Sequence, residues 1–527
     1  LYRYMLPDGS RRPDPASRFQ PQDVLGPSEL IDPSAYVWRA SWPGRRWEEI
    51  VLYELHVGAF TPAGTFRAAI DKLDHLVRLG VTAIELMPIG DFPGRWNWGY
   101  DGVFLYAPDS TYGRPGDLKA LVDAAHGRGL SVLLDVVYNH LGPEGNHLPI
   151  FSASYFDDRY QTPWGGAINF DEAHARAVRE FFIDNALYWI DEFHLDGLRF
   201  DAVHAIFDEG PRHVLDELAE RLCAASARPL HLLLENDDND PKRLTRRGQQ
   251  PVHYTAQWND DAHHVLHVAA TSERSGYYES YGETSLLAKT LAEGFGYQGQ
   301  LMPHRGRPRG GASASLPPTA FVAFIQNHDQ IGNRAFGERL GMIASAAAMR
   351  ALAATYLLLP QIPMIFMGEE WNAEQPFLYF CDFSGALADA VRQGRMAEFA
   401  RFAEFRDAAI AGRLPDPLAP ETFAATKLDW DRIDEAHLGH YCALLRTRRE
   451  RIAPLSPLIR RAGRFEILGQ SAVRIGWNAG AATLALEANL SDRPIGRAPG
   501  RGELLWAEGE AAETLGSWSV RWSLEPA

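Results

Sequence analysis

The stretch Asp196-Gly197-Leu198-Arg199-Phe200-Asp201 decides the fold and contains the first candidate site. It predicts a buried strand with a charged end, because side chains two residues apart share one face of a strand. Arg199 and Asp201 therefore point the same way, and the guanidinium is expected to favour the ionised carboxylate. A carboxylate kept unprotonated at a strand end suits the nucleophile of a glycosidase. A purely structural Arg–Asp pair explains this stretch equally well.

Seven more strands are predicted around this one, with helical patterns between many of them. Phe66, Ile70, Leu73 and Val77 recur at helical spacing and predict one helix that ends at Gly80. Repeated strand–helix units with strands apolar on both faces predict a parallel sheet with helical crossovers. Eight units favour a closed (β/α)8 TIM barrel over an open sheet. The seven runs are 50–57, 81–87, 131–137, 231–235, 252–257, 321–326 and 362–367.

The two ends of the chain have a different pattern. A short strand before Pro7-Asp8-Gly9 is followed by Pro-rich polar sequence, and after about Arg449 short alternating segments predict an antiparallel β-domain. The expected α/β chain therefore has a catalytic (β/α)8 barrel with loop insertions at 43–449 and a C-terminal antiparallel β-domain at 450–527. Residues 1–42 are expected to be the remnant of an N-terminal β-module and a linker, with an earlier piece missing.

Composition narrows the class of partner. The chain has 527 residues and a net charge of −16, which argues against nucleic acid or an anionic membrane as partner. Three distant Cys without a C-x-x-C motif indicate reduced thiols and a cytoplasmic protein. The most apolar region, 344–367, is interrupted by Arg350, Pro360 and Pro363, so it does not predict a membrane span. No obligate protein partner is predicted.

Three carboxylates each follow a separate apolar run: Asp201, Glu235 and Asp329. Catalytic groups of such barrels lie at the carboxyl ends of the strands, where buried polar side chains are costly unless they are used. The apolar residues before Glu235 are expected to raise the pKa of its carboxyl, which suits a proton donor. His140 and His328, also at strand ends, are candidate hydroxyl donors.

Aromatic residues near the strand ends are candidate platforms for sugar rings, although core packing is the ordinary role of any one of them. They are Trp96, Trp98, Tyr100, Trp258 and Trp371. Two other patterns carry less weight. The G-x-G-x-x-G match at 294–299 follows a helix rather than a strand, and His263, His264 and His267 lack an H-E-x-x-H motif. No cofactor and no metal are therefore predicted.

Four segments together resemble the signatures of the α-amylase superfamily, in the order of that family. They are 135–140, 197–204, 232–236 and 324–329. Shorter motifs resemble the maltooligosyltrehalose trehalohydrolase subfamily rather than branching or debranching enzymes. These are 12–21, 98–101, 235–240, 257–261 and 327–333. The resemblance implies a retaining hydrolase that cleaves the α-1,4 bond next to the terminal trehalose of an α-glucan oligosaccharide, in trehalose biosynthesis. The family's N-terminal β-module is nearly absent here.

The resemblance also implies residue roles: Asp201 as nucleophile, Glu235 as acid/base and Asp329 as stabiliser of the transition state. Tyr100, His140, Arg199 and His328 would hold the sugar at the cleavage point. His204 would face the leaving side, with Trp258, Asp260 and Asp261 around the trehalose end. The other substrate-binding residues expected from the matching motifs are Trp98, Asp101, Asn236, Gln257, Asn259, Gln330 and Asn333. Amylases often hold calcium near the position of Asn139, but a full set of oxygen ligands is not evident.

Two alternatives remain open at this stage. One is a glucan branching or debranching enzyme of the same superfamily, which shares the chemistry but differs in bond or acceptor. The other is a non-catalytic α-glucan-binding protein, against which the complete set of acids argues.

Overall fold

The computed structural model describes residues 1–162, 165–399, 412–496, 500, 502–509 and 514–526. Eight parallel strands close into a barrel within it, so the predicted TIM barrel is confirmed. In sequence order the strands are β3 (Leu52–Leu55), β4 (Ala83–Leu86), β7 (Ser131–Val136), β10 (Gly197–Phe200), β11 (His231–Leu234), β14 (Ala256–Trp258), β17 (Phe321–Ala323) and β18 (Ile362–Phe366). The last strand pairs with the first, β18 with β3, and this closes the sheet.

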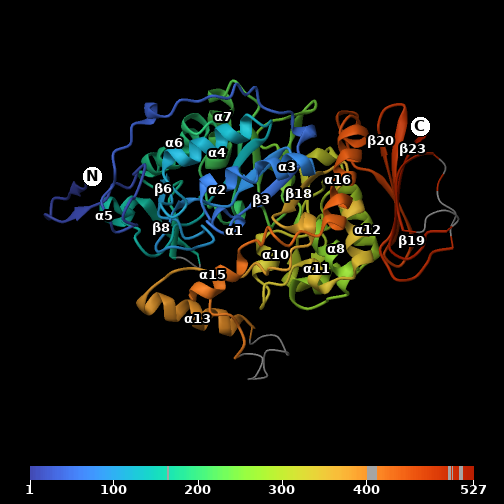
Figure 1. The fold of residues 1–527 in the computed structure, drawn as a ribbon. Helices are drawn as coiled ribbons and strands as arrows, with labels where there is room; N and C mark the ends of the chain where they lie inside the picture. The colour runs from blue at the N-terminus through green and yellow to red at the C-terminus, as the bar shows by residue number, and fades with distance from the viewer. Residues whose placement is uncertain (163–164, 400–411, 497–499, 501, 510–513, 527) are drawn as a thin grey trace.

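Helices surround the barrel (Figure 1). The longer ones are α4 (Pro115–His126), α6 (Ala175–Glu192), α7 (Val214–Ala225), α8 (Asp260–Thr271), α9 (Thr284–Glu293), α12 (Ala346–Tyr356) and α16 (Glu435–Thr447), whereas α13 (Gly385–Phe399) lies below the barrel in Figure 1, outside this ring. The single helix predicted before Gly80 is in fact two, α2 (Phe66–Ile70) and α3 (Leu73–Leu79). The chain tightens between them, because the amide of Asp71 donates to the carbonyl of Ala68, only three residues back. Gly80 does end α3, in the left-handed conformation with φ +109°.

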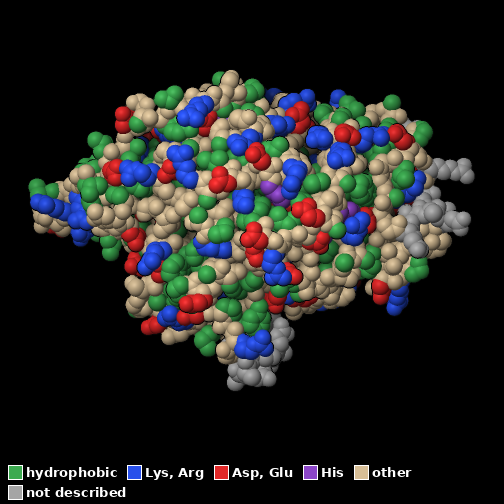
Figure 2. Space-filling model, viewed as in Figure 1, with side chains coloured by type: hydrophobic (Ala, Val, Ile, Leu, Met, Phe, Trp, Pro, Cys, Tyr) green, Lys and Arg blue, Asp and Glu red, His purple; other side chains and the backbone are tan. Residues whose placement is uncertain are grey.

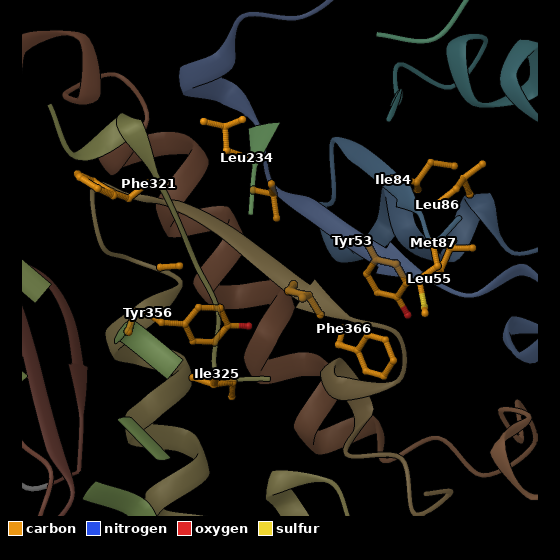
Figure 3. Close-up of a cluster of buried hydrophobic side chains, with 14 of the residues drawn as sticks. Tyr53, Leu55, Ile84, Leu86, Met87, Leu234, Phe321, Ile325, Tyr356 and Phe366 are labelled. Atoms are coloured by element: carbon orange, nitrogen blue, oxygen red, sulfur yellow. The ribbon is translucent and has the colours of Figure 1, made fainter. Parts of the chain in front are cut away.

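Apolar side chains fill the space on both sides of the strands. Inside the barrel, Leu52, Leu133 and Leu233 pack with Trp258, and Trp47 belongs to the same cluster. Outside it, strand side chains pack against the helices. Figure 3 shows part of this outer core, including Tyr53 of β3, Phe366 of β18 and Tyr356 of α12. Alternate residues of each strand thus serve two cores, which explains why the strands read as continuous apolar runs.

The C-terminal residues form the predicted antiparallel sheet, with strand order β19-β20-β21-β23-β22. The strands are β19 (Arg464–Gly469), β20 (Ala472–Asn478), β21 (Ala482–Asn489), β22 (Glu503–Glu508) and β23 (Ser519–Pro526). The sheet lies beside α12 (Figure 1). Trp522 donates its indole N–H to the carbonyl of Ala354 at 2.9 Å, and Arg350 pairs with Glu508 at 2.7 Å. These contacts join the sheet to the barrel.

The N-terminal segment forms a small hairpin and then runs along the barrel. β1 (Tyr4–Met5) pairs antiparallel with β2 (Arg11–Arg12) around the predicted turn. Farther along, the indole N–H of Trp42 donates to Asp196 Oδ1 at 2.7 Å, which ties this segment to the residue that precedes β10. In the described part of the chain, four further antiparallel strand pairs are insertions between barrel strands. They are β5 (Gly90–Asp91) with β6 (Phe104–Pro108), β8 (Phe156–Thr162) with β9 (Gly165–Ile168), β12 (Arg246–Arg247) with β13 (Gln250–Pro251), and β15 (Leu301–Met302) with β16 (Arg307–Pro308).

The surface in Figure 2 mixes acidic and basic side chains over the face shown, without a broad area of one sign. Among the described residues, none of the helices is both long enough and apolar enough to cross a membrane. The three cysteines, Cys223, Cys381 and Cys442, carry free thiols.

Candidate active site

Two of the three predicted carboxylates directly follow barrel strands, and the third lies in a helix that comes after one. Asp201 follows β10 and Glu235 follows β11, and because Phe200 pairs with Leu234 these two acids are neighbours. Asp329 lies in the first turn of α10 (His328–Gly332), after β17. All three reach solvent, since their side chains are 12%, 17% and 39% exposed respectively. A substrate can therefore approach each of them.

Arg199 joins the carboxylates from below, and its side chain has no exposed surface. Its Nη1 donates to Asp201 Oδ1 at 2.9 Å and to Asp135 Oδ2 at 2.5 Å. Its Nη2 donates to Glu235 Oε2 at 2.6 Å. The guanidinium also lies 4.2 Å from the centre of the Trp258 ring, a cation–π contact. The planar guanidinium thus sets the positions of both Asp201 and Glu235.

The two neighbouring acids differ in what surrounds their oxygens. Asp201 Oδ2 accepts from Asn139 Nδ2 at 2.6 Å, and its other oxygen accepts from Arg199. Burial raises the pKa of Asp201 although Arg199 opposes the shift, so the guanidinium does not by itself set its protonation. Burial also raises the pKa of Glu235, as expected from the apolar strand before it, and the charge of Asp201 adds to this rise, while Arg199 and the amide of Ala202 oppose it. These are the causes that favour a proton on Glu235.

The turn after Asp201 supplies a second hydrogen-bond donor to Glu235. Ala202 has a left-handed backbone with φ +39°, unusual for a residue with a side chain, and its amide donates to Glu235 Oε2 at 2.9 Å. With Arg199 on the same oxygen, Oε2 is held by two donors. Strained backbone of this kind occurs often at functional sites.

Asp329 is positioned by the start of α10. The side chain of Asn327 caps this helix, accepting from the amides of Asp329 and Gln330. Asp329 Oδ1 accepts from Asn333 Nδ2 at 3.3 Å and lies 3.5 Å from His328 Nε2. Asp329 therefore has weak partners and the most exposed carboxylate of the three, which leaves it available to a ligand.

A continuous hydrogen-bonded chain connects His328 with Arg199. His328 Nδ1 lies 2.5 Å from Glu54 Oε1, and His328 Nε2 lies 2.9 Å from the hydroxyl of Tyr100. Tyr100 in turn donates to Asp135 Oδ2 at 2.7 Å. Burial disfavours the charged imidazole, but Asp329 and Glu54 outweigh it and raise the pKa of His328 to about 9. His328 is thus a cation at neutral pH, within the site.

Other predicted residues surround this centre with polar groups. His140 Nε2 is 2.8 Å from the carbonyl of Tyr100, and Asp101 accepts from Asn97 Nδ2 at 2.7 Å. The amide of Gln330 donates to Asp260 Oδ1 at 3.3 Å. Burial, Glu235 and Asp329 raise the pKa of Asp260 to about 7. Of the remaining predicted residues, His204 and Asn333 are exposed, and Asn236 is buried.

The predicted tryptophan platforms require correction. Trp98, Trp258 and Trp371 are only 5%, 1% and 1% exposed, so none offers an open ring face to a sugar. Trp98 donates its N–H to the carbonyl of Leu378 at 2.9 Å, and Trp258 lies under Arg199 inside the barrel. Packing explains them better, because a large aromatic ring fills the volume between strands and loops.

Three further residues that were predicted to contact the substrate are buried and bond to other parts of the protein. Gln257, Asn259 and Asp261 have no exposed area, and each is bonded to the protein. Gln257 donates to the carbonyl of Asn236, and Asn259 donates to Gln361 Oε1. Asp261 accepts from Arg309 and from Tyr281.

Sequence reasoning missed three acids that lie inside the barrel: Glu54 on β3, Glu85 on β4 and Asp135 on β7. Glu54 and Asp135 hold His328 and Arg199, as described above. Neither carboxyl oxygen of Glu85 has a hydrogen-bond partner among the described residues, and burial raises the pKa of this group well above its usual value. The signal that could have found them is a single acidic residue within an otherwise apolar strand. Burying a carboxylate there costs free energy unless it has a partner or a function.

Two of the three neighbouring histidines on α8, His263 and His267, have structural partners. His263 contacts the carbonyl of Ile325 and the hydroxyl of Tyr278, and His267 contacts Glu273. Within the described ranges, no group of three or more His, Cys, Asp or Glu side chains has the arrangement of a metal site.

Known proteins resemble this chain along most of its length. The family model described as "Alpha amylase, catalytic domain" matches residues 34–161, and that described as "Domain of unknown function (DUF3459)" matches residues 460–522. A malto-oligosyltrehalose trehalohydrolase of Saccharolobus solfataricus is 44% identical, covering 85% of this chain and 77% of that protein. One of Arthrobacter ramosus is 42% identical, covering 97% and 88%. The crystal structure of a putative alpha amylase from Salmonella typhimurium is 46% identical with a TM-score of 0.95, covering 99% of this chain and 90% of that one.

Proposed function

The chain belongs to the malto-oligosyltrehalose trehalohydrolases, a family of α-amylase-type glycoside hydrolases, and from this premise we propose that Asp201, Glu235 and Asp329 carry its reaction. The reaction is hydrolysis of the α-1,4 bond beside the terminal trehalose of a malto-oligosyltrehalose, which releases free trehalose. The observation that carries the assignment is the guanidinium of Arg199, which bonds Asp201 and Glu235 together at the end of adjacent strands.

In the first step Asp201 attacks the anomeric carbon while Glu235 protonates the leaving oxygen. The new bond joins the Asp201 carboxylate to the sugar, and the trehalose leaves with the proton of Glu235. Burial raises the pKa of both acids, and each accepts hydrogen bonds from two donors. The division is supported by the charge of Asp201, which raises the pKa of Glu235 and so favours a proton on Glu235 when Asp201 is ionised.

In the second step the ionised Glu235 takes a proton from water, and the water oxygen displaces Asp201 from the sugar. The ring carries positive charge at both transition states, and the exposed Asp329 carboxylate is suited to oppose it. Tyr100, His140 and His328 form the polar wall at this position and would bind sugar hydroxyls. The net outcome is retention of configuration at the anomeric carbon.

Two single substitutions test the roles. Glu235→Gln should lower kcat by roughly 10²–10⁴, because it removes the proton donor and base. Asp201→Asn should lower kcat by about 10⁴ or more, because it removes the nucleophile. The measurement is trehalose released from maltotriosyltrehalose under saturating substrate. Asp431→Asn, at an exposed acid far along the chain, is the matched control and should turn over like the parent.

A covalent test separates nucleophile from acid. With an α-glucosyl fluoride, which needs little acid assistance to leave, Glu235→Gln should accumulate a glycosyl-enzyme that intact-mass spectrometry detects and peptide mapping assigns to Asp201. An adduct on another residue, or near-parental turnover by either variant, contradicts the assignment.

The product mixture decides between this function and a branching or debranching activity. Chromatography of digests should show trehalose from maltotriosyltrehalose and little change in amylopectin. Equal or faster reaction on amylopectin would favour the branching or debranching alternative. Binding without any depletion of substrate would favour a non-catalytic glucan-binding protein.

A further inference from the structure

A cavity of about 450 Å³ lies between the barrel and the C-terminal sheet, apart from the three acids. The barrel contributes the end of α8 and the segment 281–284, which leads from η6 (Gly276–Tyr281) into α9. The sheet contributes the β19–β20 turn, the loop after β21 and Trp518, just before β23. Its volume is within the range of about 300–1,000 Å³ found for small-molecule sites. Figure 1 shows the sheet on this side of the barrel.

The lining suits a neutral polar ligand. Two cations, Arg274 and Arg493, are matched by two anions, Glu283 and Asp492, so the cavity has no net charge. In the part of the chain that the structure describes, the side chains of Glu283, Gln470, Asp492 and Arg493 make no hydrogen bond or ion pair. They are donors and acceptors available to hydroxyl groups, and the half-buried indole of Trp518 adds an apolar surface for a ring face.

Backbone strain is concentrated at this cavity. Among the described residues, nine other than glycine have a positive φ, and three of them line it: Ser272 at +60°, Ser471 at +52° and Trp518 at +49°. Two others are Ala202, which directly follows Asp201, and Asn239, in the loop that follows Glu235. Such conformations persist only where the surrounding structure holds them, and they gather at ligand sites. The strain therefore supports the same conclusion as the unpaired polar groups.

The cavity wall is bonded to the active-site loops through Tyr281. Its hydroxyl donates to Asp261 Oδ1 at 2.7 Å, in the residue after Asp260. Arg309 Nη1 donates to the Tyr281 hydroxyl at 2.8 Å, and Arg309 Nε donates to the carbonyl of Asp237 at 2.7 Å. Asp237 follows Glu235 by two residues, so one network connects the wall of the cavity with the loop beside the proposed acid.

We propose that this cavity is a second carbohydrate site, which binds a short neutral α-glucan segment by stacking on Trp518 and hydrogen bonding to the unpaired side chains. The choice of an α-glucan among neutral polyhydroxyl ligands rests on the proposed function. Bound there, a glucan would hold long chains close to the enzyme without taking part in the reaction.

Calorimetric titration with maltoheptaose tests the proposal, using the full chain with Glu235→Gln as a background that does not consume the probe. This parent should bind two equivalents. Adding Trp518→Ala should weaken one of them by at least about tenfold, as expected for loss of an aromatic anchor. Gln470→Ala with Arg493→Ala should do the same, and because both residues are exposed and unpaired this pair should not impair folding.

Trp506→Ala is the matched control. Trp506 lies on β22 of the same sheet and is half-buried like Trp518, but it does not line the cavity. It should leave both equivalents unchanged. In the wild-type background, Trp518→Ala should raise KM for long capped chains but not for maltotriosyltrehalose, with kcat unchanged. One equivalent in the parent, or two in the cavity variants, overturns the proposal. If only the active-site function is wrong, the equivalent lost with Trp518→Ala is still observed.

Discussion

At the scale of single residues, Arg199 allows three carboxylates to lie close together in the protein interior, because its positive charge offsets their mutual repulsion. Its side chain is fully buried and bonds Asp135, Asp201 and Glu235. Burying a charge is costly, and the cost is offset only when partners of opposite sign are close and well oriented. The arrangement therefore serves position more than stability: it holds two acids at fixed distances from the same guanidinium.

His328 provides a prediction at this scale through the pH dependence of stability. Its folded pKa of about 9 lies above the unfolded value of about 6.5. A raised pKa contributes stability that is complete below pH ~6.5 and is lost as the pH rises through about 9. The difference in unfolding free energy between parent and His328→Gln should therefore be largest near pH 6 and shrink toward pH 9.5. Urea denaturation at these pH values measures it, and a constant or growing difference contradicts the charged state.

At the scale of elements, the pairing of β10 with β11 brings Asp201 beside Glu235. Gly197, the first residue of β10, lies directly against β11, and a Cβ built on it would come 2.1 Å from the carbonyl oxygen of His231. Only glycine fits this approach. The close packing at the lower end of the two strands thus fixes the geometry at their upper end, where the acids lie.

Gly197→Ala tests this dependence. The added methyl must push β10 from β11, which should cost about 1–3 kcal/mol in the free energy of unfolding. Misplacing the acids should lower kcat by roughly 10- to 100-fold. Thermal unfolding and trehalose release measure the two effects.

Gly116→Ala is the control for this substitution. Gly116 lies in the first turn of α4, and a Cβ there would meet no atom within 4 Å. It should leave kcat unchanged and raise stability slightly, by up to ~1 kcal/mol, because alanine favours helix. Parental stability and activity in Gly197→Ala would show that the strands are free to move apart.

At the scale of the whole molecule, the barrel and the C-terminal sheet share one apolar core. Trp477 and Trp522 of the sheet are fully buried and stack with ring centres 5.8 Å apart. Trp522 also bonds to Ala354 of α12, and both tryptophans belong to the same buried cluster as the outer core of the barrel. Two parts that bury surface against each other in this way are expected to unfold together.

Trp522→Ala tests the shared core. Removing a buried tryptophan should cost roughly 3–5 kcal/mol in the free energy of unfolding. In calorimetry, barrel and sheet should still unfold in one transition, at a lower midpoint temperature than in the parent. Leu504→Ala, at a half-exposed position on β22, should change stability by no more than about 0.5 kcal/mol. A separate low-temperature transition of the sheet, with the barrel unaffected, would show that the two parts fold independently.

The order of the elements and the position of the acids followed from local patterns. Each barrel strand overlaps a predicted apolar run, and Asp201 and Glu235 follow β10 and β11 directly, as expected, whereas Asp329 lies in α10 and not at the end of β17. Both depend on short segments, because a strand buried on two faces is apolar throughout and a barrel places strand ends together. The same reasoning failed at residues 71–72, where two helices replace one, since a tightened turn leaves no mark on apolar spacing.

By itself, the sequence determined that this protein is a parallel barrel with acids at the ends of its strands, because apolar periodicity and chain order are local properties. Tertiary structure alone decided which polar residues touch one another and which aromatic rings are open. Trp98 and Trp258 are closed off by segments far along the chain, and Glu54 meets His328 across 274 positions. Exposure and pairing depend on contacts between distant segments, and only the folded chain brings those segments together.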